Sequence, residues 1–266
     1  MEIDIKQVQK IETEMLREIV LILKTHHVNY FLAFGSALGA VRHNGPIPWD
    51  HDVDLFIWLD DVDSVVDLLR NNLSDRFIVD YDREKGTHLT MFPRVCLAHT
   101  VSDTIHIDLF LLYGLVDCQK KRRRQYKQLT TLHKILAHYK NRSHFVRNNA
   151  LFKFCAKLEE FLFLPITNKW LKMKYFKIAQ KYNNENSEYV GYVGMGKGDA
   201  FFRRSLFGTG ENSHYDGIIV SLPDQYDEYL QECYGDYMQY PSFEERKRGL
   251  SFKTTISDED YEAILN

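Results

Sequence analysis

The chain has 266 residues, of which 44% are hydrophobic and 14% aromatic, and its formal net charge at pH 7 is only −3. This composition supports a sizeable core and excludes disordered and collagen-like proteins. The near-neutral total conceals an asymmetry, because half of the 34 basic residues but only two acidic ones lie in residues 120–182. That stretch carries +15 and the remainder −18, which predicts a basic element facing an anionic partner such as a membrane surface, a polyphosphate or nucleic acid.

The N-terminal part of the chain alternates predicted helices and strands. Apolar residues spaced three and four apart indicate amphipathic helices, and alternating apolar and polar residues indicate strands. In chain order we predict a helix over 5–26, a strand over 28–34, a Gly35-Ser36 turn opening a short helix over 37–41, a strand over 53–57, and a helix capped by Asp60 and Asp61 that reaches residue 73.

The rest of the chain predicts three more strands and then mostly helices. The strands are expected over 77–80, 89–97 and 104–112, the basic helices over 119–182, and one helix over 224–233 in an otherwise irregular C-terminal part. We therefore predict an α+β fold with a mixed sheet flanked by helices and a basic helical subdomain. The expected divisions are a catalytic core over 1–118, a basic, aromatic-rich helical region over 119–184, and a C-terminal part over 185–266 that packs on the core and completes the site.

Two carboxylates on one strand indicate a cation site. Asp52 and Asp54 project from the same strand face, where they repel each other unless a cation lies between them. The Gly35-Ser36 turn at a helix N-terminus offers N–H groups and a hydroxyl to a phosphate. Hard oxygen ligands beside a phosphate favour Mg²⁺, with Mn²⁺ as its substitute. Alternatively, the two acids form a solvated strand face.

A third carboxylate follows on another predicted strand, where Thr104, His106 and Asp108 share a face. We predict Asp108 as the third metal ligand or as the general base of the site. An iron site built on His106 and Asp108 is an alternative, but it leaves the Gly35-Ser36 turn and the paired acids without a role.

The segment around these residues resembles a known family. Residues 34–54 read FGSALGAVRHNGPIPWDHDVD. They are similar to the signature of the LicD family of the nucleotidyltransferase superfamily, which includes the fukutin-related enzymes. The family usually has a further Asp where this chain has His51, a position off the Asp52/Asp54 register. A second similar block begins at Leu222-Pro223 and continues through residues 226–238 to Pro241.

The resemblance implies a nucleotidyltransferase-like core and a metal-dependent transferase. The expected reaction moves phosphocholine, or a related phospho-alcohol, from a CDP-activated donor such as CDP-choline to a hydroxyl of a cell-surface glycan precursor of the teichoic acid or lipopolysaccharide type, and releases CMP. Metal held by Asp52, Asp54 and Asp108 would neutralise the diphosphate, and Gly35 and Ser36 would hold phosphate oxygens.

Three neighbouring residues have two interpretations each. Arg42 is a second phosphate clamp or a surface cation. Trp49 stacks on a quaternary ammonium or serves in packing. Asp50 orients a ligand or a metal-bound water, or caps the turn into the strand.

The basic region predicts a partner of its own. Aromatic and basic residues interleave over residues 145–182, which favours peripheral contact with an anionic membrane and a lipid-linked glycan acceptor. Alternatively, the aromatics form the core of a helical subdomain and the cations its solvated face. The N-terminus has no apolar signal region, so we expect a cytoplasmic protein attached to the inner face of the plasma membrane.

Two other classes of function compete with the transferase. A nucleotidyltransferase that moves NMP to a small molecule or to nucleic acid would use the same carboxylates. A non-enzymatic nucleic-acid-binding protein would explain only the basic stretch, so nucleic acid is the less favoured partner.

Overall fold

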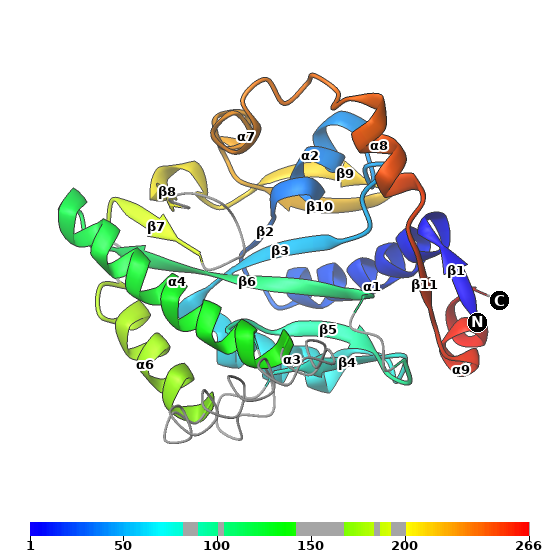
Figure 1. Cartoon of the computed structure of the whole chain (residues 1–266), viewed down its shortest axis with the longest axis horizontal. Helices are drawn as coiled ribbons and strands as arrows, with labels where there is room; N and C mark the ends of the chain where they lie inside the picture. The colour runs from blue at the N-terminus through cyan, green and yellow to red at the C-terminus, as the bar shows by residue number, and fades with distance from the viewer. Residues whose placement is uncertain (82–89, 101–103, 142–167, 184–186, 193–200, 266) are drawn as a thin grey trace, which may run out of the picture. The chain divides into compact units, whose positions relative to one another are not determined.

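A computed structural model of the chain describes all residues except 82–89, 101–103, 142–167, 184–186, 193–200 and 266 (Figure 1). The chain divides into two compact units. The first comprises Met1–Asp80, Phe92–Leu112 and Phe202–Asn266, and the second comprises Tyr81–Met91 and Tyr113–Phe201. The division into three parts expected from the sequence stays a prediction.

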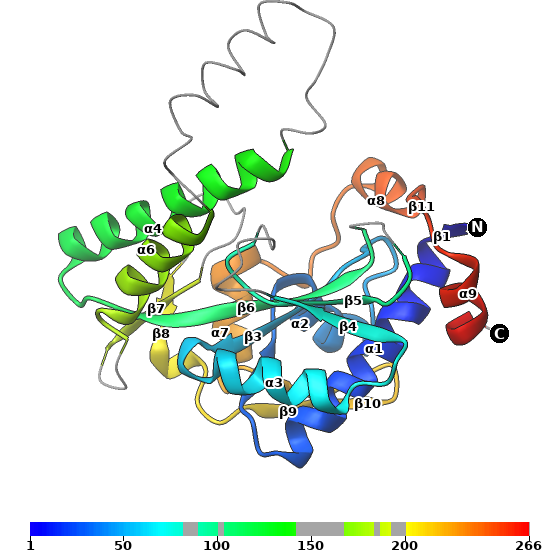
Figure 2. The same ribbon diagram turned by 90° about the horizontal axis from the view of Figure 1, so that it is seen from below.

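The first unit is built on a mixed sheet with strand order β2-β3-β6-β5-β4. Strands β3 and β6 run parallel, and the other neighbouring strands of this order are antiparallel. Helices α1 and α3 lie together on one face of these strands (Figure 2). The predicted α+β class with a mixed sheet is confirmed. The strands are β2 (Tyr30–Leu32), β3 (Val53–Trp58), β4 (Phe77–Asp80), β5 (Arg94–Leu97) and β6 (His106–Leu115).

The predicted helices of the first unit form close to their expected bounds. Asp4 and Gln7 form a capping box at the start of α1, and each accepts a hydrogen bond from the backbone N–H of the other. Asp61 stands at the N-cap of α3 but makes no side-chain capping hydrogen bond, so the capping role predicted for it is wrong. The helices are α1 (Ile5–Thr25), α2 (Phe34–His43), α3 (Val62–Asn72), α7 (Tyr226–Tyr234), α8 (Phe243–Leu250) and α9 (Asp258–Leu265).

The C-terminal part contains more regular structure than the predicted single helix. Strands β9 (Glu211–Tyr215) and β10 (Ile218–Leu222) form an antiparallel hairpin, and β1 (Glu2–Asp4) pairs with β11 (Lys253–Thr255). Asp216 and Gly217, the two residues of the hairpin loop, both have positive φ, as the tight turns that suit twisted strands require. The expectation of an irregular segment was therefore wrong here.

The second unit contains the described part of the basic region. Helices α4 (Gln119–Asn141) and α6 (Asn168–Gln180) pack together, and β7 (Tyr189–Gly191) pairs with the last residues of β6. Leu129, Tyr175 and Phe176 are buried, so these apolar side chains form a core, as the alternative interpretation of this region expected. Lys172 is only 1% exposed, so it does not belong to a solvated cationic face. The aromatic and basic residues predicted over 145–163 lie outside the described residues.

No helix in the described part of the chain combines the length and the apolar character needed to cross a bilayer. The remaining described elements are β8 (Phe201–Arg203) and two short 3-10 helices over Leu59–Asp61 and Arg204–Leu206.

Candidate active site

The register of three strands brings the predicted strand carboxylates together. Asp54 on β3 is paired with Asp108 on β6, and Asp108 is in turn paired with Arg94 on β5. Residues paired across neighbouring strands present their side chains on the same face of the sheet. Asp52 was expected on the same strand as Asp54, but the structure begins β3 at Val53, so Asp52 lies directly before the strand and is exposed, while Asp108 is buried at 8% exposure. The sheet of the first unit therefore places Asp54, Asp108 and Arg94 in a row across three neighbouring strands.

Asp108 is held by Arg94, which the sequence did not reveal, and by His106, which the sequence had placed on the same strand face. Its Oδ1 lies 2.7 Å from Nε of Arg94 and 3.3 Å from Nε2 of His106, and Nη2 of Arg94 donates a 3.4 Å hydrogen bond to Oδ2. Burial raises the pKa of Asp108, but the hydrogen bonds and charges of His106 and Arg94 together hold that pKa below its ordinary value. Asp108 is thus a fixed carboxylate that stays ionised.

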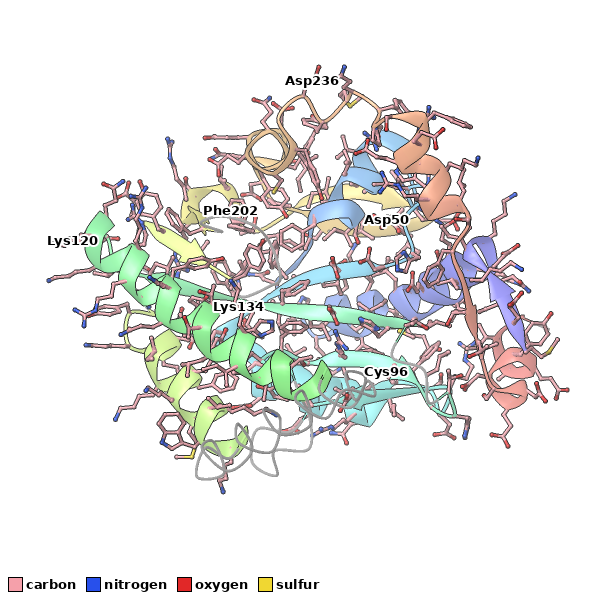
Figure 3. All side chains as sticks on the ribbon, viewed as in Figure 1. Asp50, Cys96, Lys120, Lys134, Phe202 and Asp236 are labelled. Carbon is pink, nitrogen blue, oxygen red and sulfur yellow. The ribbon has the colours of Figure 1, made fainter. Side chains whose placement is uncertain are left out.

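Asp54 and Asp50 are acids of the opposite kind. Burial, followed by the charges of Asp52, Asp108 and Asp50, raises the pKa of Asp54 well above its ordinary value, although Arg94 opposes the shift. Asp50 lies on the loop between α2 and β3 (Figure 3). Burial and then the charge of Asp52 raise the pKa of Asp50 to about 8. Both carboxyl groups hold protons more strongly than ordinary aspartates do.

The Gly35-Ser36 segment forms the first turn of α2 and fastens it to β3. The hydroxyl of Ser36, a buried side chain, accepts a 2.8 Å hydrogen bond from the Asp54 N–H. The Ser36 N–H bonds at 3.0 Å to the carbonyl of Ala33, and that of Phe34 donates to the hydroxyl of Tyr229. Two N–H groups of this turn are therefore already bonded within the protein. The phosphate-binding role of Gly35 and Ser36 stays a prediction.

Gly35 allows the Asp50 carboxylate to approach the backbone of α2 closely. A Cβ placed on Gly35 would collide with Oδ2 of Asp50. The Asp50 carboxylate therefore lies against the first turn of α2, where the positive end of the helix dipole favours a negative charge. This contact explains a glycine at this position independently of any phosphate.

Arg42 and Trp49 meet in a cluster with the C-terminal part of the first unit. Nη1 of Arg42 donates to the carbonyls of Tyr237, at 2.8 Å, and of Gln239, at 3.4 Å. The Arg42 guanidinium also lies 4.8 Å from the ring centroid of Tyr240 and 5.8 Å from that of Trp49. These contacts tie the first sequence block to the second; the phosphate-clamp role of Arg42 and the ligand-stacking role of Trp49 stay predictions.

The sequence analysis missed a buried acid on α1. Glu12 is 1% exposed, and its Oε1 has no hydrogen-bond partner among the described residues. Burial, and then the charges of Asp52 and Asp50, raise the pKa of Glu12 well above its ordinary value. A signal was present, because a glutamate stands among the apolar residues of the buried helix face.

The donor set fits a divalent cation only with help from a substrate. Within the described ranges, no three His, Cys, Asp or Glu side chains already converge as a metal-binding group. Mg²⁺ in phosphate-transferring sites is held by one or two carboxylates together with substrate phosphates and water. Exposed Asp52 and nearby Asp54 meet that requirement, and the buried Glu12, whose Oε1 is unpartnered among the described residues, interacts electrostatically with both.

A mixed sheet carrying neighbouring carboxylates beside the first turn of a short helix has the features expected of a nucleotidyltransferase-type enzyme. Residues 27–155 match the family model for the LicD/FKTN/FKRP nucleotidyltransferase domain. The chain therefore carries a LicD-family domain, and the resemblance found in residues 34–54 is confirmed. The second block, residues 222–241, lies beyond this match.

Three curated relatives agree with the domain match. The lipopolysaccharide cholinephosphotransferase LicD of Haemophilus influenzae is 23% identical over 244 residues, covering 85% of this chain and 88% of the relative. The human ribitol 5-phosphate transferase FKRP is 36% identical over 103 residues, or 38% of this chain and 20% of FKRP. The mouse FKRP is 53% identical over 49 residues, 18% of this chain and 10% of the relative. The chain therefore carries a LicD-type transferase domain, and it spans only a small part of the FKRP proteins.

Proposed function

We propose that the protein transfers a phospho-alcohol, phosphocholine in the first instance, from a CDP-activated donor to a hydroxyl of a cell-surface glycan precursor and releases CMP. The observation that carries the proposal is the pairing of Asp54 with Asp108 across the parallel strands β3 and β6. Two relatives with different alcohols in their names, choline and ribitol, support phospho-alcohol transfer as the shared chemistry.

The two paired aspartates have different parts in this proposal. Arg94 and His106 keep Asp108 ionised and oriented, so it supplies a fixed negative charge. In the metal-free protein, burial and the neighbouring acids raise the pKa of Asp54, so its carboxylate accepts a proton more readily than the ion-paired Asp108 does. In this proposal Asp54 accepts the proton of the attacking acceptor hydroxyl. Asp108 supplies a fixed negative charge beside it. The sequence had left Asp108 as either the third metal ligand or the general base, and this assignment gives the role of base to Asp54 instead.

A divalent cation, Mg²⁺ or Mn²⁺, would be held by Asp52 and Asp54 next to Asp108, where it would neutralise the donor diphosphate and its leaving CMP. The local excess of carboxylates supports this assignment, since only Arg94 opposes the acidic charges that act on Asp54. Metal dependence is tested by comparing the protein in Mg²⁺, in Mn²⁺ and in a chelator.

Trp49 bears on the choice of alcohol. Guanidinium groups of Arg42 and Arg246 lie 5.8 and 5.5 Å from its ring centroid, and the ring of His43 meets it edge-on. Cation–π attraction is therefore already satisfied by the protein's own arginines. A quaternary ammonium would have to compete with them, whereas a polyol phosphate would not. We therefore include a ribitol donor beside the choline donor in the test.

The deciding experiment measures CMP release from CDP-choline and CDP-ribitol by the purified protein, with and without a glycan acceptor. We expect Mg²⁺-dependent release that the acceptor stimulates. Asp54→Asn should abolish release, whereas Asp60→Asn, which changes an exposed acid just after β3, should not. If neither CDP-choline nor CDP-ribitol released CMP, the proposal would be contradicted.

A nucleotidyl transfer to a small molecule or to nucleic acid is the alternative chemistry of the same carboxylates. It predicts pyrophosphate release from a nucleoside triphosphate, and no CMP from a CDP-alcohol. The relatives named for phospho-alcohol transfer favour the first reaction.

A further inference from the structure

Glu12 has no structural explanation within the core that surrounds it. It lies on the buried face of α1, one turn from Val8 and one turn from Leu16, and both of these neighbours are apolar and fully buried. Its Oε1 lacks a hydrogen-bond partner among the described residues. Burying an unpaired carboxyl group costs several kcal/mol in general, so residues of this kind are rarely kept for packing alone.

The same helix face is connected directly to the loop that carries the acidic residues. Nε2 of Gln9, one turn before Glu12, donates to the carbonyls of Ile47, at 2.8 Å, and of Asp50, at 2.7 Å. Besides burial, the largest influences that raise the pKa of Glu12 are the charges of Asp52, Asp50, Asp54 and Asp108. Helix α1 thus holds the loop in place through Gln9, and the same helix carries the buried Glu12, on which the charges of the aspartates act.

An excess of buried negative charge is tolerated when a cation compensates it. Glu12, unlike Asp108, has no arginine or histidine partner among the described residues. The cation that could compensate the charge of Glu12 is therefore the same divalent cation that the neighbouring aspartates would bind.

We propose that Glu12 is an additional acidic residue of the cation site, a positioning residue that strengthens divalent-cation binding by its charge without contacting the reacting atoms. The inference rests on the metal dependence in the proposed function. Removing one negative charge close to a divalent ion should weaken binding at least about tenfold, because at an effective dielectric constant near 20 the Coulomb interaction exceeds that factor at any separation below about 20 Å.

The test measures Mn²⁺ binding to the full chain by calorimetry without any donor, together with the thermal midpoint in chelator. Glu12→Gln keeps the shape of the side chain and removes its charge. The matched control is Glu14→Gln on the same helix, because Glu14 lies away from the cluster and pairs with Arg17 at 3.4 Å. Glu12→Asp keeps the charge on a shorter side chain.

We expect Glu12→Gln to bind Mn²⁺ at least about tenfold more weakly while its metal-free midpoint stays equal to or above that of the wild type. Glu14→Gln should match the wild type, and Glu12→Asp should recover most of the lost affinity. A core role for the carboxylate predicts the reverse pattern of a lower midpoint and unchanged affinity.

Unchanged Mn²⁺ affinity in Glu12→Gln would overturn the inference and leave the proposed function intact. Failure of Glu12→Gln to fold would also overturn it, since the neutral side chain would then have proved inadequate for packing. If the wild-type protein binds no Mn²⁺ even when a CDP-alcohol is added, the metal dependence of the proposed function itself fails.

Discussion

At the scale of single residues, the paired aspartates of β3 and β6 differ because their partners differ. Asp108 is buried against Arg94, whereas Asp54 is surrounded mainly by other acids. A buried ion pair that loses one partner leaves an uncompensated charge, which is costly. Asp54 is surrounded mainly by acids, so removing its charge reduces electrostatic repulsion and does not break an ion pair like that of Asp108.

This difference predicts contrasting variants. Asp52→Asn and Asp54→Asn should lower transfer at least about a hundredfold while leaving the thermal midpoint at or above that of the wild type. Asp108→Asn should lose transfer and also destabilise the fold by about 3 kcal/mol, because Arg94 then loses its ion partner. Transfer assays and thermal unfolding of the three proteins provide the measurement. Activity within about tenfold of wild type in Asp52→Asn or Asp54→Asn would refute their assigned role.

The raised pKa of Asp50 makes the metal-free protein sensitive to pH. Its pKa rises from an ordinary value of 3.8 to about 8 on folding, so the folded state keeps a proton that the unfolded chain releases. Stability therefore declines as pH rises between these two values. In chelator, the thermal midpoint should fall from pH 5 to pH 8, and Asp50→Asn should show a shallower decline. Parallel curves for the two proteins would contradict this assignment.

At the scale of elements, α1 fixes the loop before β3 through Gln9. Gln9→Met removes both hydrogen bonds to the loop carbonyls and should cost about 1–2 kcal/mol of stability. It should also lower transfer about tenfold, because the loop carries Asp50 and Asp52. Gln7→Met is the control: it breaks the capping box of the same helix without touching the loop. Transfer should be retained in Gln7→Met even though its stability falls.

The first turn of α2 makes a second prediction. In Gly35→Ala the added methyl group meets the end of the Asp50 side chain, which can rotate away. We therefore expect a small change in the thermal midpoint but a substantial loss of transfer. Asp50→Ala removes the obstacle, so adding Gly35→Ala to it should have little further effect on transfer. A double-mutant cycle measures this coupling, and additive losses would show that Gly35 acts elsewhere.

The sequence was informative where a pattern is local. Apolar spacing placed α1 and α3 within a few residues, and the strand over 77–80 was predicted at its observed bounds. The missed hairpin was also within reach, because Asp216-Gly217 between two alternating runs is a strong turn signal. Glutamate at position 12 interrupts the apolar face of α1, and that interruption was equally visible.

The contacts that could not be predicted from the sequence depend on pairing between distant segments. No local pattern shows that Arg94 is opposite Asp108, because the register of β5 against β6 is set by the packing of the whole sheet. Likewise, the hydroxyl of Tyr229 and the carbonyl of Tyr237 reach α2 across about 195 residues of sequence separation. Residues 34–54 and residues 222–241, which are distant in sequence, are therefore in contact in the fold.

At the scale of the whole molecule, the basic stretch and the acidic residues of the candidate site belong to different units. The acidic residues of interest lie in the first unit, and the described basic helices α4 and α6 lie in the second. The exposed residues on α6 include three lysines together with Trp170 and Met173. Exposed cations beside exposed aromatic and apolar side chains are typical of contact with an anionic membrane surface.

We expect the protein to sediment with vesicles that contain phosphatidylglycerol and not with vesicles of phosphatidylcholine alone, and added salt should weaken the binding. Reversing the three exposed lysines, Lys169, Lys174 and Lys177, to Glu should reduce binding at least about a hundredfold, since each cation near the surface contributes about 1 kcal/mol. Lys172 is left unchanged because it is buried.

The control reverses three exposed cations of the first unit, Lys6, Lys247 and Arg248, and alters the net charge of the chain equally. If binding depended only on net charge, both triple variants would lose it to the same extent. Selective loss in the α6 variant would instead assign the membrane contact to the basic unit. Equal binding to neutral and anionic vesicles would remove the lipid surface as a partner and leave the solvated face of a helical subdomain as the explanation of the +15 stretch.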